Sequence, residues 1–169
     1  MSYADTLLPE FDQEMASTRK VLERIPEDKY DWKAHPKSNT FGWNANHIAE
    51  IPGWVEDTLT KTSWDFSPPG EEPYKTPEYK TRQEVLDFFD KNVAQARKAI
   101  EAVDDAALDE PWSLLFQGQA IFTSPRRMVV RSFVMNHVIH HRSHVCVYLR
   151  LNDVPVPAIY GPSGDEEWK

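Results

Sequence analysis

The sequence predicts an all-α protein in which four helices pack around one apolar core. Apolar residues recur at helical spacing in four segments that are bounded by capping residues, proline or glycine. Residues 128–151 contain neither glycine nor proline, so they can form one long helix. The length of 169 residues suits one domain, which we expect to span residues 1–169.

The first two helices are predicted from their caps and their apolar stripes. The first is expected over residues 6–25, where Pro9 would fit the first turn. The second is expected over residues 41–59, after polar capping residues that end at Thr40. Pro52 should kink this helix, because proline removes one backbone hydrogen bond and crowds the carbonyl one turn back.

A long loop and a third helix follow. Residues 62–81 contain four prolines, which favours irregular structure. A loop of this length in a small domain usually covers something or is mobile. Because it follows the second helix directly, we expect it to form one wall of a pocket. The third helix is expected over residues 82–103, after the capping-box residues Thr81 and Glu84, and it should supply core side chains.

The last part of the chain is predicted to hold the longest helix. Residues 104–123 are expected to be a connection, and their weak apolar alternation allows a short hairpin-like excursion. Ser124 is a suitable N-cap, with Pro125 at the first helical position, for a helix that ends at Leu151. The proline-rich segment that follows should lie extended across the surface.

The last helix carries four of the six histidines of the chain. At 100° per residue, they fall within a sector of about 100° on the helix. Residues 137 and 141 are one turn apart, which is the spacing at which two imidazoles can bind one ion. Apolar residues flank this sector, so it is expected to face the interior. The four are His137, His140, His141 and His144.

On the second helix, His47 lies on the apolar side together with Trp54. It can be an ordinary core histidine that is bonded to a carbonyl. Alternatively, it can face His137 and His141 and complete a set of three imidazole ligands. Glu50 lies one turn from His47, so it can act near a metal-bound water, support a ligand, or be a partly exposed helix carboxylate.

Composition excludes several classes of partner and compartment. The net charge of −8 and the pI of about 5.2 argue against nucleic acid or an anionic membrane as a partner. No uncharged run approaches the roughly 20 residues that a membrane-spanning helix needs. The start of the chain lacks the features of a signal peptide, and Cys146 alone cannot form an internal disulfide. We therefore expect a cytoplasmic protein.

The last helix has a second apolar side, opposite the histidines. A helix that is apolar on both sides is buried on both sides. In a four-helix domain one side faces the core, so the other is expected to meet a second copy in a homodimer. The residues on this second side are Met135, Ile139, Cys146 and Leu149.

The chain resembles the DinB family of bacterial damage-inducible proteins over essentially its whole length, and the match is close in three stretches. They are Trp43–Trp54, Asn136–His144 and Tyr148–Ser163. The resemblance implies an up-down-down-up four-helix bundle, with the long loop between the second and third helices, that forms a homodimer. It also implies one divalent metal ion, usually zinc or nickel, bound by His47, His137 and His141. The family often has glutamine at the position of His144. The role of this residue is therefore open: it can be a fourth ligand, hydrogen-bond to a ligand, or contact the substrate.

Three neutral imidazoles leave the ion charged and at least one coordination position open, as in catalytic rather than structural sites. The ion would lower the pKa of a bound water or thiol. We therefore expect a metal-dependent enzyme that acts on a small substrate by thiol transfer or hydrolysis, with Glu50 or His144 moving a proton. One alternative is a non-catalytic, metal-binding stress-response dimer, and another is a bundle without metal.

Overall fold

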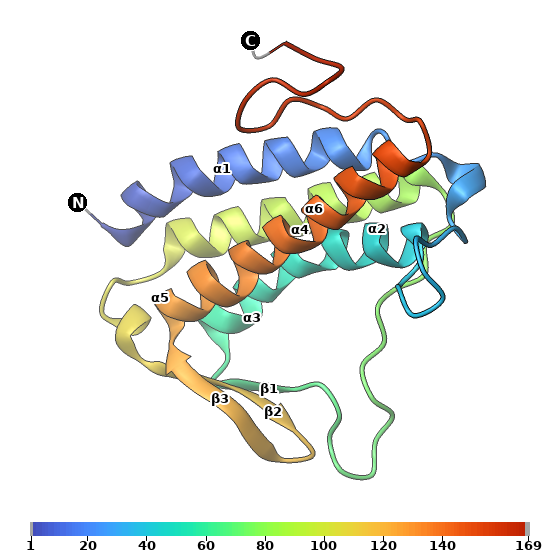
Figure 1. Cartoon of the computed structure of the whole chain (residues 1–169). Helices are drawn as coiled ribbons and strands as arrows, with labels where there is room; N and C mark the ends of the chain where they lie inside the picture. The colour runs from blue at the N-terminus through green and yellow to red at the C-terminus, as the bar shows by residue number, and fades with distance from the viewer. Residues whose placement is uncertain (1, 168–169) are drawn as a thin grey trace.

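Long helices form the body of the molecule, which the computed structural model describes over residues 2–167. They are α1 (Tyr3–Leu22), α2 (Phe41–Glu50), α3 (Trp54–Thr60), α4 (Arg82–Ala102) and α6 (Asn136–Leu151). Helices α1 and α6 run in one direction, whereas α2, α3 and α4 run in the opposite direction (Figure 1). Short 3-10 turns, η1 (Glu27–Lys29) and η3 (Ala107–Asp109), precede α2 and the second strand.

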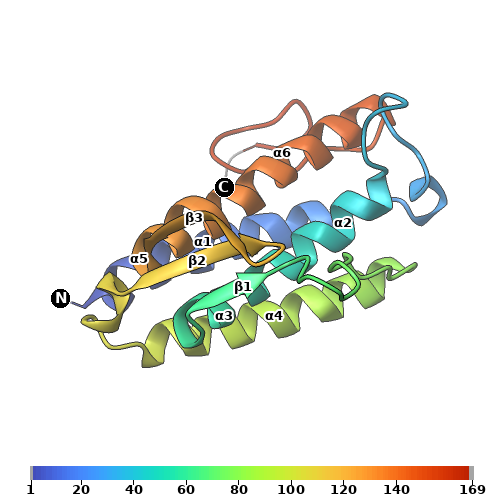
Figure 2. The ribbon, with the colours of Figure 1, turned by 90° about the horizontal axis from the view of Figure 1, so that it is seen from below.

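The prediction of an all-α fold is wrong, because a three-stranded mixed sheet packs beside the helices (Figures 1 and 2). Strand β1 (Ser63–Asp65) pairs in parallel with β2 (Pro111–Phe116). Strand β2 then pairs antiparallel with β3 (Gln119–Pro125). The hairpin-like excursion is thus confirmed, but its pairing with a strand from the long loop was not predicted.

The hairpin turn explains how the three strands are held together. Gln117 and Gly118 both have positive φ, 50° and 75°, as a two-residue type I′ turn requires. Gly118 has no side chain to strain in this conformation. Its N–H donates to Asp65 Oδ2 over 2.7 Å, which ties the turn to β1.

The predicted kink at Pro52 is confirmed. Helix α2 ends at Glu50, a 3-10 turn, η2 (Ile51–Gly53), follows, and α3 continues the path. At the other end of α2, Thr40 is the N-cap, since its side chain accepts from the Trp43 N–H over 3.1 Å. The capping box of α4 is also confirmed at Thr81 and Glu84.

Two predicted helix starts are wrong. Helix α1 begins at Tyr3 behind a capping box of Ser2 and Asp5, so Pro9 lies inside the helix. Strand β3 continues through Pro125, so Ser124 is a strand residue and not an N-cap.

The last helix is not a regular α-helix along its whole length. A short turn, α5 (Arg126–Met128), leads into a π-helical segment, η4 (Val129–Met135), and only then into α6. A π-helix has more residues per turn than an α-helix. Side chains before Asn136 therefore point in directions that differ from those on an ideal α-helical wheel.

The second apolar side of the last helix is covered within the chain. Met135 and Leu149 have no exposed area, and they belong to the same core cluster as Phe11 and Met15 of α1. Three apolar residues of the C-terminal segment, Val154, Val156 and Ile159, pack against this cluster. The expectation that Met135 and Leu149 meet a second copy is therefore wrong.

Between α6 and α1 lies a buried ion pair, Arg142 with Glu14. The two side chains are 2.7 Å apart, and both residues are less than 7% exposed. Arg142 also donates to the Glu14 carbonyl and to Thr18 Oγ1, over 3.1 and 3.2 Å. The Tyr160 hydroxyl donates to Glu14 Oε2 over 2.8 Å, which fixes the C-terminal segment over this pair.

None of the described helices combines the length and the apolar composition that a membrane-spanning helix requires.

Candidate metal centre

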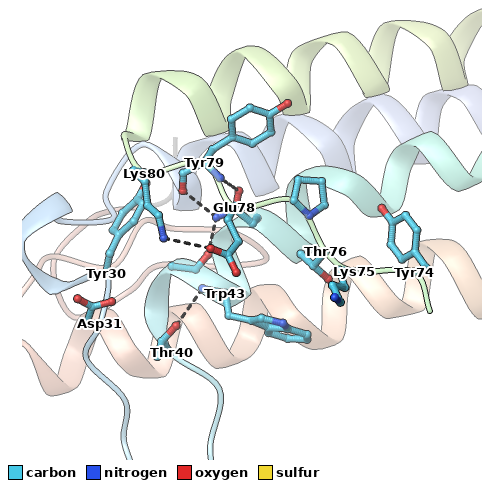
Figure 3. Close-up of a pocket in the computed structure, with 13 residues that line it drawn as sticks. Tyr30, Asp31, Thr40, Trp43, Tyr74, Lys75, Thr76, Glu78, Tyr79 and Lys80 are labelled. Atoms are coloured by element: carbon cyan, nitrogen blue, oxygen red, sulfur yellow. Dashed lines mark hydrogen bonds and ion pairs between the residues drawn. The ribbon is translucent and has the colours of Figure 1, made fainter. Parts of the chain in front are cut away.

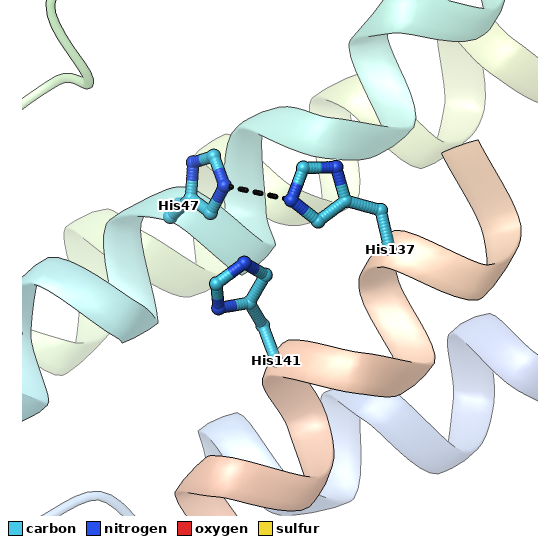
Figure 4. A group of neighbouring side chains, drawn as sticks. All are labelled: His47, His137 and His141. Carbon is cyan, nitrogen blue, oxygen red and sulfur yellow. Dashed lines mark hydrogen bonds between the residues drawn. The ribbon is translucent and has the colours of Figure 1, made fainter. Parts of the chain in front are cut away.

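The structure brings His47 of α2 together with His137 and His141 of α6 (Figure 4). One nitrogen from each ring lies within 4.8 Å of the other two. The Nε2 atoms of His47 and His137 are 3.3 Å apart. The ring centroid of His141 lies 4.6 Å from that of His47 and 4.9 Å from that of His137. The three rings thus surround one point between the two helices.

Glu50 fixes the orientation of His47. Its Oε1 accepts from His47 Nδ1 over 2.5 Å and from the Thr76 hydroxyl over 2.8 Å. Its Oε2 accepts from the Tyr74 hydroxyl over 2.5 Å. A proton on Nδ1 leaves the lone pair of His47 on Nε2, which faces the other two rings. Burial and the bond to Glu50 raise the pKa of Tyr74, so its hydroxyl stays a donor.

Asn44 has the corresponding role for His141. Its side-chain amide donates to the Thr40 carbonyl over 2.8 Å, which leaves Oδ1 to accept from His141 Nδ1 over 3.2 Å. The lone pair of His141 is then on Nε2. Sequence reasoning missed Asn44, although a signal was present, since it lies three residues before His47 and therefore on a neighbouring position of the same helix.

Aromatic rings enclose the three histidines. Trp43 stacks on His47 at 4.5 Å, and Trp54 meets the rings of His47 and His137 edge-on at 5.6 and 5.3 Å. Burial, together with the neighbouring imidazoles, lowers the pKa of His137 to about 4 and that of His141 to about 3. Both rings are therefore neutral at pH 7, with lone pairs available for a metal ion.

A cavity of about 220 Å³ adjoins His47. Its walls come from helices α2 and α3, strands β1 and β2, the long loop and the π-helical segment η4. The prediction that the loop after the second helix walls a pocket is confirmed, because four lining residues come from residues 62–81. The lining residues are His47, Glu50, Trp54, Trp64, Phe66, Tyr74, Thr76, Leu114 and Phe133.

A larger groove of about 800 Å³ runs between the start of α2 and the loop over residues 74–80 (Figure 3). Trp43 lines the groove and also stacks on His47. Tyr74 and Thr76 line both the groove and the smaller cavity. The loop therefore separates the two spaces with the same two side chains that donate to Glu50.

His140 and His144 do not join the three inner histidines. Both are exposed, their rings are 4.3 Å apart, and neither lines the cavity. The expectation that all four histidines of the last helix face the interior is wrong for these two. The two occupy one half of the predicted sector, and His137 and His141 occupy the other half. The remaining histidine, His35, is exposed in the segment before α2.

The inner donor set fits a divalent transition-metal ion. Zn–N bonds of about 2.0–2.1 Å place two nitrogens of a tetrahedral site about 3.3 Å apart, which matches the separation of His47 Nε2 and His137 Nε2. Imidazole ligands suit zinc, nickel, copper and iron, but not magnesium or calcium. Glu50 is held by three donors behind His47, so it supports a ligand in this arrangement.

Comparison with known proteins agrees with this architecture. The chain is similar to a DinB-like protein from Bacillus cereus ATCC 10987, with a TM-score of 0.65 and 23% identity over 90% of this chain and 95% of that one. It is also similar to a DinB-like protein from Bacillus subtilis, with a TM-score of 0.67 and 15% identity over 97% and 99% of the two chains. At these identities the likeness shows the fold alone. No curated protein matches the chain. Residues 10–145 match the sequence model of the DinB superfamily, and this protein therefore belongs to that superfamily.

Proposed function

We propose that this protein is a mononuclear metalloenzyme that acts on a small substrate by thiol transfer or hydrolysis. His47, His137 and His141 bind the ion, which is zinc or nickel. The observation that carries the proposal is the convergence of three imidazoles beside an aromatic cavity, with two of the rings oriented by hydrogen bonds to Glu50 and Asn44. A divalent ion held there supplies Lewis acidity, which lowers the pKa of a bound water or thiol.

Glu50 has two roles in this proposal. As a positioning residue, it keeps the proton of His47 on Nδ1, which preserves the lone pair for the ion. It is also the carboxylate among the residues that line the cavity, so it is our candidate for moving a proton there. Its three donors use three of about four acceptor positions of the carboxylate, which leaves one position on Oε2 to accept a proton.

The cavity indicates the kind of substrate. Trp54, Trp64, Phe66 and Phe133 form apolar walls, which favour a flat or apolar group over a polar one. A volume of about 220 Å³ is below the range for drug-sized ligands, so the bound group is small. The net charge of −8 argues against nucleic acid as the substrate, and the single cysteine agrees with a reducing, cytoplasmic compartment.

The test of this proposal combines metal analysis with a substrate screen. Purified protein should contain one zinc or nickel ion per chain. After cobalt replacement, added thiols should change the visible absorption of the ion. Thiols paired with electrophiles, and simple esters and amides, should then be screened with wild-type protein and with His137→Ala as the inactive control. The enzymatic proposal fails if metal-loaded wild-type protein turns over none of these compounds.

A second candidate is a metal-binding stress-response dimer without catalysis. It is favoured by the positions of His47 and His137, 90 residues apart in the sequence, because an ion between them would tie α2 to α6. In that case chelation should lower Tm strongly, while thiols leave the cobalt spectrum unchanged. For both candidates we propose that the chain forms a homodimer, and sedimentation of the wild-type protein should then give twice the chain mass of 19.6 kDa.

A further inference from the structure

The exposed histidines of α6 form a second cluster of possible ligands. His140 and His144 are one helical turn apart, and their ring centroids are separated by 4.3 Å. His141 lies beside both, at 5.0 and 5.6 Å between centroids. One nitrogen from each of these three rings lies within 4.8 Å of the other two, as in the inner group.

The two clusters share one residue, His141. A neutral imidazole has one N–H and one lone pair, so it can serve one ion at a time. His141 therefore belongs to the inner group or to the outer group, but not to both at once. When the inner group holds an ion, only His140 and His144 are left for a second one.

We propose that His140 and His144, with His141 as a shared ligand, form a second and exposed binding site for a divalent transition-metal ion. The site rests on the metal centre proposed above only through the competition for His141. Its imidazole ligands select zinc, nickel, copper or cobalt over magnesium and calcium. The acidic net charge of the protein lowers the electrostatic cost of adding a second cation.

The position of the outer site suggests what it does. Both of its own ligands are exposed, whereas His47 is only 8% exposed and lies behind Trp43. An ion that arrives from solvent meets the outer histidines first and can take His141 as its third ligand. The same ring can then accompany the ion to His47 and His137. The outer site is therefore a loading site for the inner centre.

Calorimetric titration of metal-free protein with Zn²⁺ tests whether the outer site binds an ion at equilibrium. Wild-type protein should show a tight event and a weaker one. The variant His140→Ala with His144→Ala should keep the tight event at unchanged affinity and lose the weaker one. His35→Ala, which removes another exposed histidine, should keep both. Alanine is the best helix former, so the double variant is expected to fold.

A variant of the inner centre tests the sharing of His141. In His47→Ala the inner event should disappear, which releases His141 to the outer site. The outer event should then be tighter than the second event of wild-type protein by more than about tenfold, since it gains a ligand. His137→Ala serves the same purpose if His47→Ala does not fold. An outer event of unchanged affinity contradicts the sharing.

Loading kinetics test the proposed role. The double variant should take up Zn²⁺ into the inner centre several-fold more slowly than wild type, with the same final affinity. NMR of the imidazole signals gives a check without variants, because a second equivalent of Zn²⁺ should move the signals of His140 and His144 and leave that of His35. The proposal is overturned by a single binding event in wild-type protein or by two events in the double variant. The inner centre can still pass its own test in either case.

Discussion

Helix α6 buries polar side chains on two of its sides, and the two groups are built differently. Toward α1, Arg142 meets Glu14, Thr18 and Tyr160, so that opposite charges are paired and donors meet acceptors. Toward α2, His137 and His141 meet another histidine, His47. These rings are of one chemical kind, and one nitrogen of each lies within 4.8 Å of the other two.

The difference separates a structural cluster from a ligand site. A buried charge is tolerated when its partners satisfy it, and the group around Arg142 meets this condition within the chain. Ring nitrogens of histidines that face one another lack a partner of this kind. Each pair of nitrogens needs a proton or a cation between its two atoms. The same helix thus holds a closed polar group and, one residue away in sequence, a group of histidines that we propose is completed by a metal ion.

Breaking the closed group should have the largest effect on stability. Glu14→Ala leaves the charge of Arg142 buried and unpaired, so it should lower the free energy of unfolding by about 3–5 kcal/mol. Denaturant unfolding measures this. Asp12→Ala is the matched control on the same helix, because Asp12 pairs with Arg97 at the surface and should cost at most about 1 kcal/mol. Equal losses in the two variants would contradict the comparison.

Removing an inner histidine should affect metal binding and leave the closed group intact. His137→Ala should weaken Zn²⁺ binding by more than about 100-fold, because losing a ligand costs more than losing its supporting partner. In a titration the tight event of the inner centre should disappear, and the event that remains should be that of the outer histidines. Unfolding of the metal-free variant should stay close to that of metal-free wild type. If the tight event persists at unchanged affinity in His137→Ala, another set of ligands must hold the ion.

Changing the supporting residues should have a smaller effect on the same measurement. Glu50→Gln removes the carboxylate that holds the proton on His47 Nδ1, and it should weaken Zn²⁺ binding by about 10- to 100-fold. Asn44→Ala should act similarly through His141. Thr81→Ala, which removes a helix cap away from the site, should leave the affinity unchanged. An unchanged affinity in Glu50→Gln would exclude its positioning role.

The pH dependence of stability should show the most gradual effect. The pKa values of His137 and His141 are lowered from 6.5 in the folded, metal-free protein, to about 4 and about 3. Below pH 6.5 the unfolded chain therefore binds protons that the folded chain does not, so stability should fall as pH drops from about 6.5 to 4. Unfolding at several pH values should show a shallower decline in His137→Ala. A decline of equal slope would place its cause elsewhere.

Local rules predicted the elements that depend on nearby residues. The cap at Thr81, the break at Pro52 and the spacing of His137 and His141 are all set within one or two turns. The residues alone left His47 open between a core histidine and a third ligand, and the resemblance to the DinB family implied its meeting with these two histidines.

Features that depend on contacts between distant parts of the sequence were not predicted. Strand β1 has three residues and pairs with residues fifty positions later, so its sequence alone holds no signal of pairing. The π-helical turns of η4 shift side chains away from the ideal wheel. The covering of Met135 and Leu149 depends on how the proline-rich C-terminal segment folds back, which its composition does not specify. Asn44, Tyr74 and Thr76 were missed because each is polar and common, and only three-dimensional contact reveals its partner.

The carboxylate of Glu50 is shared between a histidine and two hydroxyls on the long loop, and this has a thermodynamic consequence. Two processes that use one acceptor are linked, and linkage is reciprocal. If metal binding by the histidines strengthens the hydrogen bonds from Tyr74 and Thr76 to Glu50, then formation of these bonds raises the affinity for the metal ion by the same factor. Cleavage of the loop by a protease would therefore report on metal occupancy without any contact between the protease and the ion.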